Sequence, residues 1–281
     1  MSREASKKEQ ALCRFSTTRF LRCPVCEASL RLPQGAGSLS CKNNHSFDVA
    51  RQGYLNLFLG AQNSQYDRDL FVARQKVFAA GVYDPLVAAV AQLMDRLNLK
   101  APCILDAGCG EGSFLAKISE YVGESKLIGL DLARDGIRLA TSHGAPVMWL
   151  VADLAQLPLE AASVDLLLNV LSPANYGEFR RVLKPEGTLI KVLPGEDYLV
   201  EIRERLPGLT PYSNQEVLGK FVDQIHVEEC LPLQYHVGVT EELWAAMVQM
   251  TPLSRKREIL GDRPGRLTID LQILKGSWTE S

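Results

Sequence analysis

Four residues near the start of the 281-residue chain have the types and spacing of metal ligands. Two residues lie between Cys23 and Cys26, fourteen between Cys26 and Cys41, and three between Cys41 and His45. Two intervening residues let a tight turn direct both thiolates at one ion, and the whole spacing is typical of Cys3His zinc sites. The alternative is that three reduced cysteines and a histidine occur here without binding a metal. That alternative does not explain why they fall into two pairs at the spacing of metal ligands. Because four protein ligands fill a tetrahedral shell, the predicted zinc is structural rather than catalytic.

A second segment has the pattern of a nucleotide-binding turn. It follows the apolar run 103–105, reads D-x-G-x-G-x-G, and contains Asp106, Gly108, Gly110, Glu111 and Gly112. Glycines let the backbone approach a ligand closely, and the helix expected over 113–121 offers free N–H groups at its start. Asp131 ends the next apolar run, nineteen residues past Gly112, where a carboxylate suits the ribose hydroxyls of an adenosine.

These residues need a scaffold, and the chain supplies alternating apolar runs and helical patterns. Strands are expected at 103–105, 126–130, 146–151, 165–170 and 187–193, with helices at 113–121, 133–141 and 176–183. Such alternation predicts an α/β fold with a parallel sheet and helices on both faces. Two further strands, at 227–239 and 267–274, flank a helix expected at 241–250.

Charge is unevenly distributed along the chain. The net charge of −2 combines residues 1–60, which hold nine basic and four acidic side chains, with a remainder that holds 22 basic and 29 acidic ones. A module facing a polyanion and a solvated basic tail both fit this split. No apolar run reaches the ~18–20 residues of a membrane span, and the charged start lacks a secretory pattern, so we expect a cytoplasmic protein without a membrane partner.

The segment 63–86 is helical in pattern and carries Arg68, Arg74 and Lys76. It connects the front module to the body. Its basic side chains would either line a nucleic-acid cleft or form the solvated face of a packing helix.

The glycine turn resembles motif I of the class I S-adenosylmethionine methyltransferases, since a dinucleotide site would read G-x-G-x-x-G instead. The resemblance extends through Gly129-Leu130-Asp131, Val151-Ala152-Asp153 and the Lys184-Pro185-Glu186-Gly187 turn. It implies a Rossmann-like, mostly parallel seven-stranded sheet, which the strands at 227–239 and 267–274 complete. It also implies that Asp131 holds the ribose and that Asp153 neighbours the adenine; an ordinary helix cap is the alternative for Asp153.

The whole chain resembles the bacterial 23S rRNA (guanine-N1)-methyltransferase family. The similarity runs through Cys-Pro-x-Cys at 23–26, His-Ser-Phe-Asp at 45–48, Gly-Tyr-Leu-Asn-Leu at 53–57, the linker 80–86 and Met-Thr-Pro at 250–252. It implies a zinc-ribbon-like, RNA-contacting domain over 1–60, a helical linker over 61–100 and a methyltransferase domain over 101–281. The implied partner is a 23S rRNA hairpin, and a homodimer with paired zinc modules is an assembly that the resemblance allows.

By the same resemblance, Tyr83 of the linker and Tyr198 after Pro194-Gly195 contact the cofactor. An aromatic side chain that packs the linker onto the sheet is the alternative for Tyr83. Members of the family can carry histidine at the position of Tyr198. The loop 169–175 after the fourth strand resembles a substrate-facing loop.

The target atom, guanine N1, lies on the Watson–Crick edge, so the base must be unpaired or flipped. The sequence identifies no general base, and Asp165 is expected to orient a strand end instead.

Three functions therefore compete. The first is an enzyme that methylates N1 of a guanine in a 23S rRNA hairpin loop, with a role in macrolide resistance as in some members of the family. The second is a small-molecule methyltransferase of the quinone type, which would not need a basic zinc module. The third is a non-catalytic RNA-binding protein of ribosome assembly, which would not need an intact glycine turn with both acids.

Overall fold

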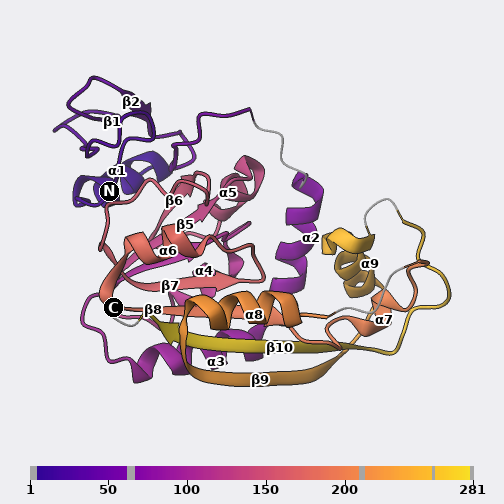
Figure 1. Ribbon diagram of the computed structural model, residues 1–281. Coiled ribbons are helices and arrows are strands. Elements are labelled where there is room, and N and C mark those ends of the chain that lie inside the picture. The colour runs from indigo at the N-terminus through magenta and orange to yellow at the C-terminus, as the bar shows by residue number, and fades with distance from the viewer. Residues whose placement is uncertain (1–4, 62–66, 209–212, 255–256, 279–281) are drawn as a thin grey trace.

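The computed structural model describes residues 5–61, 67–208, 213–254 and 257–278, and an eight-stranded sheet runs through it (Figure 1). The strands of this sheet are β3 (Tyr54–Asn56), β4 (Cys103–Ala107), β5 (Lys126–Asp131), β6 (Val147–Val151), β7 (Val164–Val170), β8 (Leu183–Pro194), β9 (His226–Gly238) and β10 (Arg266–Ser277). Their order is β3-β6-β5-β4-β7-β8-β10-β9, in which the first six strands are parallel, β10 pairs antiparallel with β8, and β9 pairs antiparallel with β10.

Helices and a small hairpin are the other regular elements of the described residues. The helices are α1 (Lys7–Ser16), α2 (Arg68–Ala79), α3 (Asp84–Arg96), α4 (Ser113–Ile118), α5 (Arg134–Ala140), α6 (Tyr176–Val182), α7 (Val200–Arg203), α8 (Gln215–Gln224), α9 (Glu241–Met250) and the 3-10 turn η1 (Pro252–Ser254). A separate antiparallel pair is formed by β1 (Ser38–Ser40) and β2 (Ser46–Asp48).

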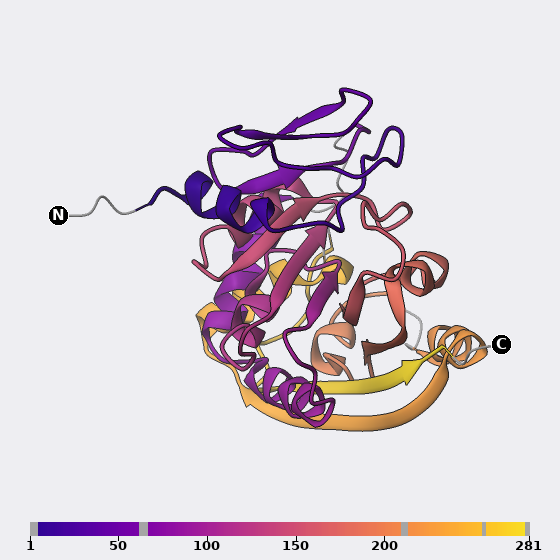
Figure 2. The ribbon, with the colours of Figure 1, turned by 90° about the vertical axis from the view of Figure 1, so that its left-hand side faces the viewer.

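The central strands are apolar along their length because both faces of the sheet are covered. Every residue of β4 and β6 is buried, as expected for parallel strands between two helical layers. Apolar side chains of α2 to α5 and α9 pack on one face, and those of α1, α6 and α8 pack on the other (Figure 2). The order reverses between β4 and β7, so the crevice at the carboxyl ends of these strands is the place where such a sheet binds ligands.

The expected fold class is confirmed, and the sheet has one strand more than the seven predicted. The extra strand, β3, comes from the front of the chain and pairs in parallel with β6, where Leu55 lies opposite Leu150. Leu55 is fully buried and belongs to the same apolar cluster as Phe15 and Leu39 of the front segment and Leu105 of the sheet. The front module and the sheet therefore share one core. Three residues are too few for a period of two to show, which is why the sequence did not predict this strand.

The helical pattern expected over 63–86 corresponds to two helices; residues 63–66 of this segment lie outside the described residues. Two helices, α2 and α3, meet here at a bend of 77°, and Gly81 between them has a φ of +76°. A left-handed residue ends a helix, so the chain turns before Tyr83 and α3 starts in a new direction.

Among the described residues no single helix is long and apolar enough to cross a membrane. The bent pair α2 and α3 passes a test of length and composition together, but Leu70, Val77, Leu86 and Val90 on it are buried in the protein's own core.

The shared core makes a prediction for Leu55. Leu55→Ala should lower the free energy of unfolding by about 2–5 kcal/mol, because it leaves a cavity under β3. Chemical denaturation would measure this. Leu59→Ala is the matched control, since Leu59 is 61% exposed and its truncation should change stability by less than about 0.5 kcal/mol. Equal effects of the two substitutions would contradict the shared core.

Candidate functional site

The four predicted metal ligands meet in the front module. The Sγ atoms of Cys23, Cys26 and Cys41 and a ring nitrogen of His45 all lie within 4.8 Å of one another. The Sγ atoms of Cys26 and Cys41 are 3.7 Å apart, and Nδ1 of His45 is 3.5 Å from the Sγ atoms of both Cys23 and Cys41. A tetrahedral ion with Zn–S bonds of about 2.3 Å and a Zn–N bond of about 2.0–2.1 Å would separate its ligand atoms by about 3.5–3.8 Å. The residues present therefore fit a structural zinc ion.

Two similar turns present these ligands. The backbone N–H of Glu27 donates to the carbonyl of Cys23, and the N–H of Asn44 donates to the carbonyl of Cys41. Glu27 and Asn44 both have a positive φ, near +60°, which closes each turn tightly. The backbone N–H of Ala28 is the main factor that lowers the pKa of the Cys26 thiol to about 6, so the fold favours the thiolate that binds metal.

Removal of one zinc ligand should release the metal. Cys26→Ser is expected to lose the zinc ion measured by metal analysis and to lower the midpoint of thermal unfolding, because metal binding and folding are coupled. Cys13→Ser is the control, since Cys13 is exposed and lies outside the ligand cluster. Zinc retained at full occupancy in Cys26→Ser would contradict the assignment.

The glycine turn lies at the carboxyl end of β4, at the switch point of the sheet. Gly108, Gly110 and Gly112 all have positive φ values, from +58° to +86°. A Cβ atom at Gly108 would lie 1.8 Å from Oγ of Ser172, and one at Gly112 would lie 2.6 Å from the ring of Trp149. No other residue could therefore occupy these two positions without moving its neighbours, and the backbone of Gly108 lines the crevice.

Asp131 holds this turn in place. Its Oδ2 accepts a hydrogen bond from the N–H of Gly110 at 2.7 Å, and its Oδ1 accepts one from the N–H of Ala133 at 2.7 Å. The carboxylate thus joins the end of β5 to the glycine turn. Asp153 is placed differently: its Oδ1 accepts from the N–H of Ala155 at 2.8 Å, which forms an Asx turn. In the described residues no helix begins at this turn, so the helix cap that was the alternative for Asp153 is not formed.

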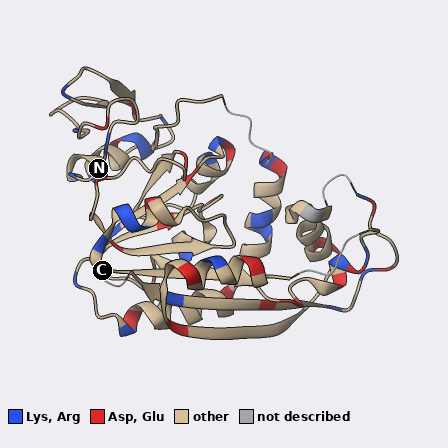
Figure 3. Cartoon of the chain, viewed as in Figure 1, with Lys and Arg blue, Asp and Glu red and all other residues tan. Residues whose placement is uncertain are grey.

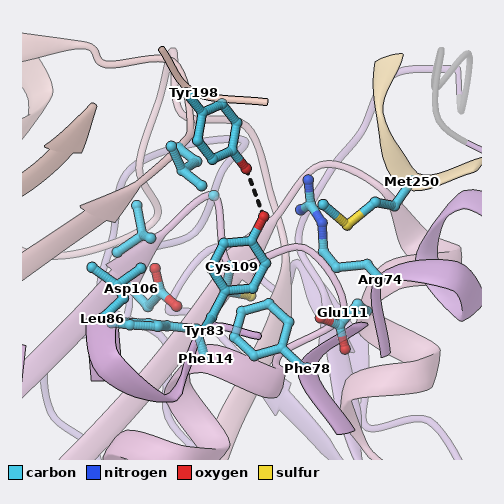
Figure 4. Close-up of a pocket in the computed structure, with 13 residues that line it drawn as sticks. Arg74, Phe78, Tyr83, Leu86, Asp106, Cys109, Glu111, Phe114, Tyr198 and Met250 are labelled. Carbon is cyan, nitrogen blue, oxygen red and sulfur yellow. Dashed lines mark hydrogen bonds between the residues drawn. The ribbon is translucent and has the colours of Figure 1, made fainter. Parts of the chain in front are cut away.

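A small cavity, of about 50 Å³, lies beside the turn. Figure 4 shows Tyr83 and Tyr198 at its upper side, where their hydroxyl groups share a hydrogen bond of 2.6 Å. Asp106, Gly108 and Glu111 also line this cavity, whereas Gly110, Gly112, Asp131 and Asp153 do not. The structure therefore brings five of the nine predicted cofactor residues together around one space.

The carboxyl groups of Asp106 and Glu111 and the guanidinium of Arg74 line this cavity. Asp106 is 1% exposed, and its Oδ1 is buried without a hydrogen-bond partner. Burial, followed by the charges of Asp131 and Glu111, raises the pKa of Asp106 to about 8. Glu111 accepts from Oγ of Ser113 at 2.6 Å and faces Nε2 of His143 at 3.4 Å, a hydrogen bond that raises the pKa of His143. An orphaned carboxyl oxygen among other acids is complementary to a positively charged ligand, such as the sulfonium and ammonium groups of S-adenosylmethionine.

A second, larger cavity, of about 500 Å³, adjoins the first. The two cavities share Arg74, Leu171, Tyr198 and Met250, so a ligand in one lies next to a ligand in the other. Part of the loop expected to face the substrate, 171–174, lines the larger cavity. Asp165 lies at the other end of β7, where it binds the N–H of Cys103 and the Nζ of Lys184, so its expected role in orienting a strand end is confirmed.

Lys191 and Arg74 line the cavities, and the sequence did not predict either of them there. Lys191 lines the larger cavity from β8 although it is only 1% exposed. The signal was present, because a lysine in the apolar run 187–193 is unusual for a buried strand. Arg74, which we expect from the sequence either in a nucleic-acid cleft or on the solvated face of a packing helix, borders both cavities in the structure.

A switch-point crevice with this glycine turn, beside a Cys3His zinc ribbon, defines a class I S-adenosylmethionine-dependent methyltransferase with an added metal module. Comparisons with known proteins agree: residues 104–187 match the model of a methyltransferase domain, and residues 21–64 match the zinc-ribbon model described as RlmA, N-terminal. The chain belongs to the 23S rRNA (guanine-N1)-methyltransferase family.

Two relatives support this assignment, and a third, from another methyltransferase family, is similar over a shorter part of the chain. The YxjB protein of Bacillus subtilis (strain 168), named as a candidate 23S rRNA (guanine-N(1)-)-methyltransferase, is 34% identical over 92% of this chain and 96% of its own length. The 23S rRNA (guanine(748)-N(1))-methyltransferase of Streptomyces fradiae is 36% identical over 75% of this chain and 76% of its own. The malonyl-[acyl-carrier protein] O-methyltransferase of Methylovorus sp. (strain MP688) is 35% identical, but over only 54% of this chain and 58% of its own.

The buried acid makes a prediction about pH. The folded protein keeps a proton on Asp106 up to a pKa of about 8, whereas the unfolded chain releases it near pH 4. The free energy of unfolding of the ligand-free protein should therefore fall as the pH rises from about 5 to 8. Asp106→Asn should flatten this fall in urea denaturation, while Asp153→Asn, outside the cavity, should keep the wild-type slope. Parallel curves for wild type and Asp106→Asn would contradict the argument.

Proposed function

We propose that this protein transfers a methyl group from S-adenosylmethionine to N1 of a guanine in a hairpin loop of 23S rRNA. The observation that carries the proposal is the joint presence of a Cys3His ribbon and a two-cavity crevice in one core. The similarity to YxjB supports it because it spans both parts, from the ribbon through the sheet. The similarity to the malonyl-carrier enzyme covers about half the chain, and a carrier-bound or small acceptor gives the metal module no role.

The small cavity and the glycine turn form the proposed cofactor site. S-adenosylmethionine supplies a methyl group that its sulfonium charge already activates. We assign its binding to Tyr83, Asp106, Gly108, Gly110, Glu111, Gly112, Asp131, Asp153 and Tyr198. The cavity of about 50 Å³ is below the ~300–1,000 Å³ of ligand pockets. Side chains around Tyr83 and Tyr198 therefore move apart when the cofactor enters.

The larger cavity is the proposed acceptor site. Its volume of about 500 Å³ is within the range of small-molecule pockets, and it opens next to the end of the small cavity that Tyr198 borders. Guanine N1 is hidden in a base pair, so the nucleotide must be unpaired or flipped to reach this space. Tyr176 and Tyr198 on the cavity wall offer rings on which a base can stack. The chain's main contribution is to position the base against the methyl group.

The zinc ribbon is the proposed grip on the hairpin. Lys7, Arg19, Lys42 and Arg51 are exposed on residues 1–60, and Figure 3 shows basic residues on this module and on α2. Phosphate contacts of this kind dominate RNA affinity and weaken with salt. In this proposal, residues 1–60 bind the RNA, residues 61–100 connect the two domains, and residues 101–281 catalyse methyl transfer. A cytoplasmic location, a homodimer with paired ribbons and a contribution to macrolide resistance are further parts of the proposal.

A labelling experiment tests the function. With labelled S-adenosylmethionine, the protein should methylate 23S rRNA at one loop guanine, seen as a reverse-transcription stop because N1-methylation blocks pairing. Gly110→Arg should abolish the stop, since a side chain there meets Nη1 of Arg74 at 2.9 Å from its Cβ. Gly123→Arg, where a Cβ meets nothing within 4 Å, is the matched control. Label in small metabolites or an acyl carrier, with none in rRNA, would overturn the proposal.

A further inference from the structure

Lys191 is a buried lysine on the wall of the proposed acceptor site, and nothing so far gives it a role. It lies in β8 directly across from Asn169 of β7 and from Leu274 of β10. Both Lys191 and Ser172, whose carbonyl oxygen accepts a hydrogen bond from Nζ at 3.2 Å, line the larger cavity. We propose that Lys191 is the base that removes the N1 proton of the guanine, an inference that rests on the proposed function.

The hydrogen bonds of Nζ leave one position of this atom open. Nζ donates to Oδ1 of Asn169 and to the carbonyl of Ser172. A neutral amine has two N–H donors and one lone pair, so these two acceptors use both donors. The lone pair of Nζ then remains free to accept a proton, and it lies beside the cavity in which the guanine would bind. Asn169 cannot take the proton instead, because an amide is not basic near neutral pH; its Nδ2 donates to the carbonyls of Ala107 and Pro173.

The charges around Lys191 also favour the neutral amine. Among the residues that the structure describes, no carboxylate forms an ion pair with it. Its strand neighbours Asn169 and Leu274 carry no charge, and the other cations on the cavity wall are Arg74 of α2 and Lys220 of α8. The remaining titratable groups on that wall are the phenols of Tyr176 and Tyr198. Burial without a counter-ion lowers the pKa of Lys191 to about 8, which suits a base working near neutral pH.

The proposed step balances as follows. The N1–H bond of guanine breaks and its proton passes to the lone pair of Nζ. The electron pair left on N1 forms the N1–CH3 bond, while the S–CH3 bond breaks and its pair stays on sulfur, giving S-adenosylhomocysteine. Lys191, now an ammonium, returns its proton to water after the methylated nucleotide leaves. No oxidant, metal or further reactant is needed.

Single-turnover rates at saturating cofactor, with 23S rRNA as substrate, test this role. Lys191→Met should lower the rate by about 10²–10⁴-fold, the usual contribution of a general base, without a similar change in the Kd for S-adenosylhomocysteine or for RNA. Lys191→Arg should be equally slow, because a guanidinium keeps the charge but cannot accept a proton. Lys184→Met is the matched control, since Lys184 lies on the same strand, half-exposed and ion-paired with Asp165 at the far end.

A Lys191→Ala variant adds a readout that a structural role would not move. Small primary amines should restore part of its rate, in proportion to the concentration of their unprotonated form. A rate for Lys191→Arg close to wild type would overturn the proposal in favour of an ammonium that only contacts the guanine. Rates within about threefold of wild type for all three variants would also overturn it.

The wild-type protein provides a test that does not depend on the folding of any variant. Its single-turnover rate should rise with pH and level off above about pH 8, as Lys191 loses its proton. A rate that is flat or falls between pH 6 and 9 would overturn the inference. Because wild type would still methylate the guanine in that case, failure of this inference is distinguishable from failure of the proposed function, in which no rRNA is labelled at all.

Discussion

One buried amide ties together the strands on which both cavities are built. Asn169 is fully buried at the carboxyl end of β7; it donates to the carbonyls of Ala107 in β4 and Pro173 in the following loop, and it accepts from Lys191 in β8. Ala107 and Lys191 are buried, so the amide of Asn169 gives both of them a polar partner inside the core, where an unpaired polar group costs about 1–3 kcal/mol. The three strand ends and the substrate-facing loop are therefore held in one arrangement, and the positions of the glycine turn and of Lys191 depend on it.

The metal module is part of the same framework rather than an independent attachment. Its third strand extends the sheet, and Leu21 forms an isolated bridge with Leu159 beyond the carboxyl end of β6. Oγ of Ser29, between the ligand pairs, donates to Oε1 of Glu160 at 2.6 Å. The zinc site thus fixes the shape of a surface whose position relative to the crevice is set by sheet pairing. In the proposed function, a hairpin bound to the metal module would therefore have its loop at a constant distance from the crevice.

Much of the site could be predicted from sequence because its parts are local. The Cys3His quartet and the glycine turn are short patterns whose spacing reflects a single turn each, and both formed as expected. Elements that depend on distant partners could not be predicted. The three residues of β3 form a strand only because they pair with the edge strand β6. The angle between α2 and α3 at Gly81 depends on how α3 packs against the sheet. Lys191 is significant because Asn169 and Ser172 meet it across the fold, and the sequence gives no sign of their proximity.

The hydroxyl–hydroxyl contact between Tyr83 and Tyr198 has a kinetic consequence. These side chains are 115 residues apart in the chain and come from different segments, one before α3 and one after β8. Their 2.6 Å hydrogen bond closes one side of the small cavity, so binding of the cofactor as proposed requires a conformation in which the two hydroxyl groups are apart. The apparent affinity is then the intrinsic affinity multiplied by the fraction of molecules in that conformation. If the cofactor binds as proposed, the rate at which the two phenols separate is an upper limit on the rate at which it enters.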